Sequence, residues 1–230
     1  MAHGSHSQNS REMPFTPEEV KNYKERFSKA ISSGHNKGDV LINISSGINI
    51  DYLDSAKKNF KEIIILQPTD SQTRNSTELA GKSDQPEGKE TEHGHEEAII
   101  RVVKFDLNKE NPTDPNKLPQ ADSMVVGTVL ETMSGDIKEY VRYLRKIASL
   151  LKPKGHLIMF GVLNGTFYKA GGEKFHVVKY NEDDLRNILT NEGFVITNIE
   201  VSQRKVESDL MDSDSVVFCT ADKGPKSYAA

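Results

Sequence analysis

The chain has 230 residues, 28% of them charged, and its formal net charge is −4 at pH 7. This length allows one large domain with a hydrophobic core. The slightly acidic balance argues against nucleic acid and against an anionic membrane surface, because both are bound through dense positive charge. We therefore expect a small-molecule partner, and the sequence leaves a protein partner open.

The cysteine and the apolar runs bear on the compartment. Cys219 is the single cysteine, so no internal disulfide can form, which suits a reducing compartment. It lies in the apolar run VVFCTA, which favours a buried core thiol over a nucleophile. No apolar run approaches the ~18 residues of a membrane-spanning helix, and MAHGSHSQNSREM at the start lacks the apolar segment of a signal peptide. We expect a cytoplasmic protein.

Composition divides the chain into one domain, two tails and a long loop. Residues 69–97 are rich in Ser, Thr, Gly, Lys and Glu, so they cannot bury enough apolar surface to offset their ordering entropy. The histidines His3, His6, His93 and His95 lie in such polar surroundings, which favours solvated side chains over a metal site. The predicted divisions are a flexible tail over 1–14, a single domain over 15–223 with a low-complexity loop at 69–97, and a tail over 224–230.

In the first half of the domain, short apolar runs alternate with a segment of helical period. Continuous apolar runs of this length are typical of strands buried on both faces. They predict strands over 40–44, 61–67, 98–105 and 121–130. Between the first two strands, the sequence predicts a helix over about 49–59.

The clearest helix is predicted over 136–151, because its apolar residues fall on one helical face. Asp136 is the expected N-cap, and Lys152-Pro153-Lys154-Gly155 is the expected stop before a strand over 156–163. The residues of the apolar face are Ile137, Tyr140, Val141, Leu144, Ile147 and Leu151.

One more helix and two strands complete the domain. The helix is predicted over 180–192, because acidic residues from Glu182 onward stand at its positive end and Gly193 follows it. The strands over 194–203 and 213–221 follow without a long helix between them. We therefore expect an antiparallel pair at one edge of the sheet.

These elements predict an α/β fold. Strands buried on both faces and followed by helices imply a Rossmann-like, doubly wound sheet that is mostly parallel, here with an antiparallel edge pair. Ligands bind such sheets beyond the carboxyl ends of the strands, where the strand order reverses. We therefore expect residues 43–49, 67–70, 106–107 and 127–132 to surround one crevice.

An ordered series of motifs resembles one family of S-adenosylmethionine-dependent methyltransferases. The family is that of the nicotinamide, phenylethanolamine and indolethylamine N-methyltransferases, and the resemblance spans nearly the whole domain. LLKPKGHL alone is weak, whereas the ordered series is specific. The segments are FTPEEVKNYKERF at 15–27, KGDVLINISSGINIDYL at 37–53, NFKEIIIL at 59–66, KFDL at 104–107, LPQADSMVV at 118–126, YLRKIASLLKPKGHLIMFG at 143–161, TFYKAGGEKF at 166–175 and NEGF at 191–194.

The resemblance implies which residues would hold the cofactor, S-adenosylmethionine, and where that site is altered. Ser45 stands where the family has a glycine that lets the backbone approach the methionine part, so crowding is expected. Gln67 stands where an acidic residue accepts hydrogen bonds from the ribose hydroxyls, and its neutral amide makes weaker bonds. Binding is therefore expected to be weakened or lost. The implied cofactor residues are Asn43, Ser45, Ser46, Gly47, Gln67, Asp106, Leu107 and Thr128.

The resemblance also implies an altered acceptor side. Val20, Lys24 and Glu25 stand at places where an N-terminal helix of the family carries tyrosines, and Tyr23 is one step out of register. After the fifth strand, Gly161 and Gly165 stand where the nicotinamide enzyme has an aspartate and a serine. Methyl transfer depends on proximity and orientation, so the loss of these groups lowers the expected rate.

Four readings of function remain open on the sequence, and one of them, an abundant secreted or storage role for an old enzyme fold, has no specific support in the residues. The leading one is a divergent family member with weak or no catalysis that acts as a binding or structural protein. The alternative is an active N-methyltransferase with an altered acceptor, whose candidate polar groups are Glu131, Asn164, Thr166, Tyr168 and His176. The third is a Rossmann-like domain without a ligand, in which Ser45 and Ser46 only cap the following helix.

Overall fold

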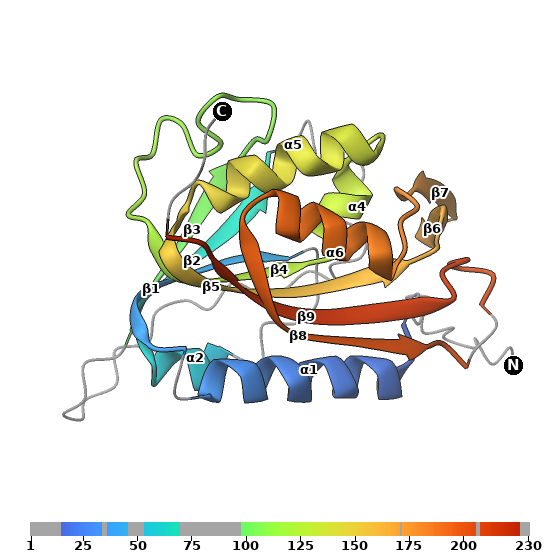
Figure 1. Ribbon diagram of the computed structural model, residues 1–230, viewed down its shortest axis with the longest axis horizontal. Coiled ribbons are helices and arrows are strands. Elements are labelled where there is room, and N and C mark those ends of the chain that lie inside the picture. Colours follow the sequence, from blue (N-terminus) through green and yellow to red (C-terminus); the bar gives the residue numbers. More distant parts are fainter. Residues whose placement is uncertain are drawn as a thin grey trace, which may run out of the picture.

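The computed structural model describes residues 15–33, 36–45, 53–69, 98–170, 172–205 and 208–225. A central sheet lies between two layers of helices, with α4, α5 and α6 on one side and α1 and α2 on the other (Figure 1). The predictions for residues 46–52, for the histidines at 3, 6, 93 and 95 and for most of the tails and the 69–97 loop lie outside the described residues.

The main sheet has seven strands in the order β3-β2-β1-β4-β5-β9-β8. The first five are parallel, and β9 is antiparallel to both β5 and β8. The predicted doubly wound sheet with an antiparallel edge pair is confirmed. The strands are β1 (Gly38–Ser45), β2 (Phe60–Pro68), β3 (Ile99–Phe105), β4 (Ala121–Gly127), β5 (Leu151–Leu163), β8 (Phe194–Gln203) and β9 (Ser215–Lys223).

Each face of the sheet has its own hydrophobic core. On one face, α4 (Val129–Met133), α5 (Ile137–Ala148) and α6 (Glu182–Asn191) pack through residues such as Leu130, Leu144 and Leu189. On the other face, α1 (Pro17–Ser32) and α2 (Leu53–Lys57) pack through residues such as Phe27 and Ala56. Burial on both faces explains the continuous apolar runs of β1, β2, β4 and β5. The apolar run at 98–105 was wrongly expected to be buried in the same way, because β3 is an edge strand and is largely exposed, as is β8 at the other edge.

Two predicted boundaries were wrong around β4 and β5. The strand expected over 121–130 ends at Gly127, because Thr128 has a left-handed φ of 49° and Val129 begins the short helix α4. The helix expected over 136–151 ends at Ala148, although Asp136 does cap its start. Residues 152–155, expected to stop the helix, belong instead to β5, which begins at Leu151. The pairing of β4 with β5 changes register across these residues.

Other helix boundaries were closer. The helix expected over 180–192 is α6, and Asn181 is its N-cap, with a side chain that accepts a hydrogen bond from the Asp184 backbone. Of the helix expected over 49–59, the described part is α2, which ends at Lys57. The predicted start of this helix, at about residue 49, lies outside the described residues.

A small hairpin was not predicted from the sequence. β6 (Phe167–Ala170) pairs antiparallel with β7 (Glu173–His176), and Gly172 has a positive φ of 81° in the turn. Strands of four residues are too short to show a clear alternation. The hairpin is attached to the β8–β9 connection, because the Lys169 backbone donates to Leu210 O over 2.6 Å.

Cys219 is fully buried on β9, as the sequence predicted. Burial raises the pKa of its thiol to about 12, so the thiol stays protonated and unreactive near neutral pH. None of the helices in the part of the chain that the structure describes has the length and hydropathy needed to cross a membrane.

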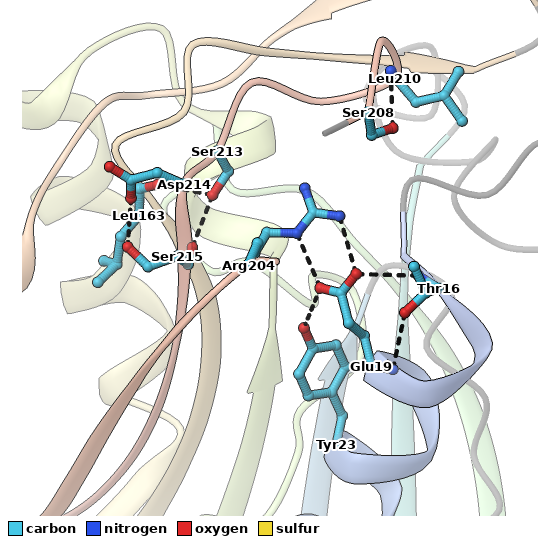
Figure 2. A network of polar contacts seen from close by, with 10 residues as sticks. All are labelled: Thr16, Glu19, Tyr23, Leu163, Arg204, Ser208, Leu210, Ser213, Asp214 and Ser215. Carbon is cyan, nitrogen blue, oxygen red and sulfur yellow. Dashed lines mark hydrogen bonds and ion pairs between the residues drawn. The ribbon is translucent and has the colours of Figure 1, made fainter. Parts of the chain in front are cut away.

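Helix α1 is fixed to the sheet by aromatic packing and by ion pairs, Arg26 with Glu200 of β8 and Glu19 with Arg204 just after β8. Its start carries a capping box between Thr16 and Glu19. Glu19 also receives two hydrogen bonds from Arg204, of 2.9 and 3.1 Å, and a third of 3.0 Å from the Tyr23 hydroxyl (Figure 2). The Arg204 side chain is 2% exposed, so this pair is largely shielded from solvent.

We predict that Arg204→Met lowers the free energy of unfolding by about 3 kcal/mol, because a largely buried carboxylate loses its partner. The double variant Glu19→Met/Arg204→Met should regain part of that loss, since no charge is then left unpaired. Urea denaturation of the wild type, both single variants and the double variant tests this. Strictly additive losses would contradict the pairing.

Candidate functional site

The register of the sheet places the predicted site residues along one edge. Ser45 is opposite Gly127 in the β1–β4 pair, and Asn43 is opposite Ile65 in the β1–β2 pair, which puts Ser45 level with Gln67. Gln67 is in turn opposite Lys104, two residues before Asp106. Neighbouring strands lie about 4.8 Å apart, so the carboxyl ends of four strands form one row.

The end of β1 supplies the middle of this row. Asn43 is buried, with 1% exposure, and lies between Ile65 and Val125 in register. Its side chain is therefore covered on one face of the sheet, away from open solvent. Ser45 ends the strand, and its side chain, with Ser46 and Gly47, lies outside what the structure describes.

The end of β2 carries no acidic group. Gln67 is exposed, and Pro68 follows it as the last residue of the strand. Proline has no backbone N–H to donate. The next donor along the chain, the Thr69 backbone, is used by Phe105 O over 3.0 Å. Among the residues that the structure describes here, the strand end thus offers a ligand the neutral amide of Gln67.

The end of β3 turns sharply. The half-buried Asp106 accepts a hydrogen bond of 2.9 Å from the Asn108 backbone through Oδ1, while Leu107 is fully buried in the core. The Asp106 backbone donates to Pro112 O over 2.8 Å. The turn thus holds the Asp106 carboxylate at the edge of the sheet, beside the end of β2.

The end of β4 shows backbone strain at Thr128. A β-branched residue in the left-handed region costs on the order of 1–3 kcal/mol. The strain is maintained because the Thr128 backbone donates to Phe160 O over 2.9 Å and its carbonyl accepts from the Thr132 hydroxyl over 2.7 Å. Such strain is concentrated at functional sites, and Thr128 stays a predicted site residue.

A small apolar pocket opens beside Thr128. Of the described residues that line it, none has a charged side chain, and most come from segments on the α1 side of the sheet. Tyr168 is the one acceptor candidate of the sequence analysis that lines it. Phe15, Val162, Val177 and Met211 were not identified from the sequence, whereas Thr132 lies in the expected range 127–132. The lining residues are Phe15, Thr128, Thr132, Val162, Tyr168, Val177 and Met211.

Phe15 closes the pocket from the start of α1. Its ring is 7% exposed and lies 5.5 Å from Tyr23 and 5.9 Å from Phe160, both edge-on. The Arg204 guanidinium lies 5.6 Å from the centre of the Phe15 ring, within cation–π range. The capping motif Thr16-x-x-Glu19 directly after Phe15 was a sequence signal for this position.

Glu131 lies behind the pocket on α4. It is 2% exposed, and its Oε1 accepts a hydrogen bond of 3.0 Å from the Val162 backbone. Its side chain also contacts the Tyr180 hydroxyl, whose ring lies 5.3 Å from that of Tyr140. Burial raises the pKa of the Glu131 carboxyl to about 7, and the hydrogen bonds from Val162 and Tyr180 oppose that rise.

The two glycines of the altered acceptor side make room for neighbours. A Cβ on Gly161 would lie 2.3 Å from the Tyr180 hydroxyl and 3.1 Å from Glu131 Oε1, and a Cβ on Gly165 would lie 3.0 Å from Ser213 Cβ. Gly161 therefore allows the Glu131–Tyr180 contact. The aligned helix positions Val20, Lys24 and Glu25 are part-exposed or exposed on α1, whereas Tyr23 is buried.

Other polar acceptor candidates already form hydrogen bonds outside the pocket. Two of them lie in the segments 164–166 and 212–214, which are called the rim. Asn164 donates to Asp214 over 3.0 Å, and Thr166 donates to Asp212 through both its backbone and its hydroxyl. These hydrogen bonds help to hold the pKa of both carboxylates below the ordinary value. His176 is exposed, and its Nε2 lies 3.1 Å from Gly135 O. The structure does not bring these three side chains into the pocket.

Comparison with known proteins assigns the family. Residues 70–224 match the model of the NNMT/PNMT/TEMT family. Indolethylamine N-methyltransferase from Oryctolagus cuniculus is 30% identical over 224 residues, which cover 88% of this chain and 84% of that protein. The chain belongs to the NNMT/PNMT/TEMT family. This is the family that the ordered motifs resembled, a family of small-molecule N-methyltransferases that use S-adenosylmethionine.

Another member of this family is similar to the chain at nearly the same sequence identity. Nicotinamide N-methyltransferase from Homo sapiens is 28% identical over 81% of this chain and 78% of its own length. Among solved structures, a SAM-dependent methyltransferase from Methanosarcina mazei superposes with a TM-score of 0.57 at 16% identity, covering 83% of this chain and 94% of that chain. At this identity the structural likeness supports the methyltransferase fold alone.

The buried carboxyl of Glu131 predicts an unusual pH dependence. Between its ordinary pKa of 4.5 and the folded value of about 7, the folded chain keeps a proton that the unfolded chain releases. The free energy of unfolding should therefore fall as pH rises through this window, by up to roughly 3 kcal/mol, and level off above it. Urea denaturation at pH 5 and pH 8 measures this change.

Glu131→Gln is the control, because an amide does not titrate in this range. Relative to this variant, the wild type should gain up to roughly 3 kcal/mol of stability as pH falls from 8 to 5. Carboxylates with a lowered pKa, such as Asp122 and Asp212, act below this window and are common to both proteins. Parallel pH profiles would show that Glu131 is ionised in the folded state throughout.

Proposed function

We propose that this chain is a divergent small-molecule N-methyltransferase family member with little or no methyl-transfer activity. In this proposal it binds S-adenosylmethionine weakly, mainly through the nucleoside, and acts as a binding protein. The observation that carries the proposal is the end of β2, where an exposed neutral Gln67 and a proline replace a carboxylate. The proposal includes Asn43, Ser45, Gln67, Asp106, Leu107 and Thr128 as the described part of the cofactor site.

The energetics of the crevice favour weak binding. A hydrogen bond to a charged group contributes about 1.5–3 kcal/mol, so the neutral Gln67 costs roughly one to two orders of magnitude in affinity. The Asp106–Leu107 turn and the strained Thr128 keep the adjoining strand ends shaped for a ligand. The ends of β3 and β4 thus keep polar groups for a ligand, whereas the end of β2 has lost its charged one.

The acceptor side favours low activity. Transfer of a methyl group needs the acceptor held in line with the donor, and such positioning contributes much of the rate. Here the pocket is closed by Phe15, Tyr168 and Met211, and Asn164 and Thr166 are engaged by aspartates of the rim. The lining residues within the described ranges offer no charged side chain that could fix the amine of an acceptor.

A second candidate function is methyl transfer to an acceptor that differs from those of the named relatives. The observation that favours it is Glu131, whose pKa is raised to about 7 directly behind Val162 of the pocket wall. Buried carboxyls of this kind are common where protons are exchanged. A rearrangement that moved Glu131 toward the pocket would provide a proton acceptor.

The first test introduces a negative charge at the end of β2 and measures ligand affinity. We expect Gln67→Asp to tighten S-adenosylhomocysteine by about tenfold, because a carboxylate makes charge-assisted bonds with sugar hydroxyls. Asp106→Ala should abolish measurable binding. The matched control is Gln203→Asp, which adds the same charge at the exposed end of β8, away from the crevice. Calorimetric titration measures all four proteins, and equal affinities would show that the crevice does not hold the nucleoside.

Turnover separates the two candidate functions. Transfer of labelled methyl groups from S-adenosylmethionine to a panel of small amines and heteroaromatic nitrogen compounds, extending beyond nicotinamide, phenylethanolamine and indolethylamine, should stay at background for the wild type at saturating donor. Turnover that is lost in Glu131→Gln would instead establish the second candidate.

Phe15 provides a test of the closed pocket. Phe15→Ala should lower the free energy of unfolding by roughly 3–5 kcal/mol and leave an apolar cavity, and such cavities bind small apolar rings. Indole should therefore raise the melting temperature of Phe15→Ala and leave the wild type unchanged.

The matched control for this cavity is Phe27→Ala. Phe27 packs on Phe160 and Phe218 in the same core but does not line the pocket. Its variant also leaves a buried apolar cavity, so indole can stabilise it too, but only in Phe15→Ala should bound indole contact pocket residues such as Tyr168 and Met211. If wild type and Phe15→Ala respond to indole alike, Phe15 does not close the pocket.

A further inference from the structure

Two side chains of α5 hold the turn that follows β3. Lys146 Nζ donates to Leu107 O over 2.7 Å and to Lys109 O over 2.6 Å. The Tyr143 hydroxyl lies 3.0 Å from Asn108 Oδ1. Each residue from Leu107 to Lys109 is thus contacted from α5, directly after Asp106.

The helix that supplies these groups is itself firmly anchored. Tyr143 and Lys146 are three residues apart, so they project from neighbouring positions on one helical face. Between and beside them, Tyr140, Leu144 and Ile147 are buried in the core at 1% exposure or less. The hydroxyl of Tyr143, which is 3% exposed, also lies 3.0 Å from Glu139 Oε1 one turn earlier. The contacts to the turn therefore start from a rigid support.

The contacts fix the direction of the peptide groups in the turn. Because the Leu107 carbonyl points to Lys146, the Asn108 N–H of the same peptide unit points the opposite way. This N–H donates to Asp106 Oδ1 over 2.9 Å. The position of Lys146 therefore determines the orientation of the Asp106 carboxylate at the sheet edge through one rigid peptide plane.

We infer that Lys146 and Tyr143 are positioning residues for ligand binding, which hold the Asp106–Leu107 turn in its binding conformation before the ligand arrives. This inference rests on the proposed function, which places the nucleoside at that turn. Pre-ordering removes the entropy cost of fixing the turn on binding. Because Gln67 supplies no charge at the neighbouring strand end, the ordered turn accounts for a larger share of the affinity.

The chain contains a matched control for the lysine contacts. Lys223 Nζ donates to Ala148 O over 2.7 Å and to Leu151 O over 2.8 Å. It uses the same donor group and also two carbonyls, but it braces the α5–β5 connection at the amino-terminal end of the parallel strands. Its loss should affect stability alone.

The experiment compares Lys146→Met, Lys146→Arg, Tyr143→Phe and Lys223→Met with the wild type. Calorimetry measures the dissociation constant of S-adenosylhomocysteine, and thermal melts measure stability. We expect Lys146→Met to weaken binding by about tenfold, in line with the loss of two charge-assisted bonds that order the turn. Tyr143→Phe should weaken it less, Lys146→Arg should restore most of the affinity, and Lys223→Met should lower the melting temperature without changing affinity.

The outcomes separate this inference from the proposed function. If the wild type binds and Lys146→Met binds equally well, or if Lys223→Met loses as much affinity, the positioning role is wrong. If the wild type does not bind at all, the proposed function fails. Amide hydrogen exchange at Asn108 and Lys109 then decides whether the turn is held, because exchange should be faster in Lys146→Met than in Lys223→Met, and equal rates would overturn the inference.

Discussion

The parallel pairing of β1 with β4 is the constraint on which the rest of the structure depends. From this pair the chain continues outward in both directions, to β2 and β3 on one side and to β5 on the other. The strand order reverses between them, so the connections diverge and leave an opening beyond Ser45 and Gly127. Gln67, Asp106 and Thr128 lie around that opening because their strands keep register with this central pair.

Beside these strand ends, hydrogen bonds and an ion pair hold the segments around the pocket in place. The same hydrogen bonds engage polar side chains that could otherwise contact an acceptor. Asp212 and Asp214 engage Thr166 and Asn164, and Glu19 with Arg204 holds the start of α1, where Phe15 enters the pocket. The same bonds that stabilise the rim leave the pocket apolar. Family membership therefore fixes the architecture, while the chemistry of an individual site depends on a few substituted side chains.

Much of the fold could be predicted from hydrophobic patterns. The central strands, buried on both faces, give continuous apolar runs, and the sequence of α5 has a clear apolar face. Thr128 marks where this failed: a backbone in the left-handed region ended β4 early, and nothing in the run of apolar residues announced it. The pocket was missed in part because Phe15 and Met211 come from segments far apart in sequence. Contacts such as Lys146 with Leu107 depend on three-dimensional placement that periodicity does not contain.

The central claim is that the carboxyl edge of the sheet still receives the nucleoside of S-adenosylmethionine. The most direct measurement is a titration of isotope-labelled wild-type protein with S-adenosylhomocysteine, followed by amide chemical shifts. The account predicts shifts that saturate at high ligand concentration and centre on Asp106, Leu107 and Thr128. Shifts centred elsewhere on the protein, or none up to the solubility limit of the ligand, would contradict it.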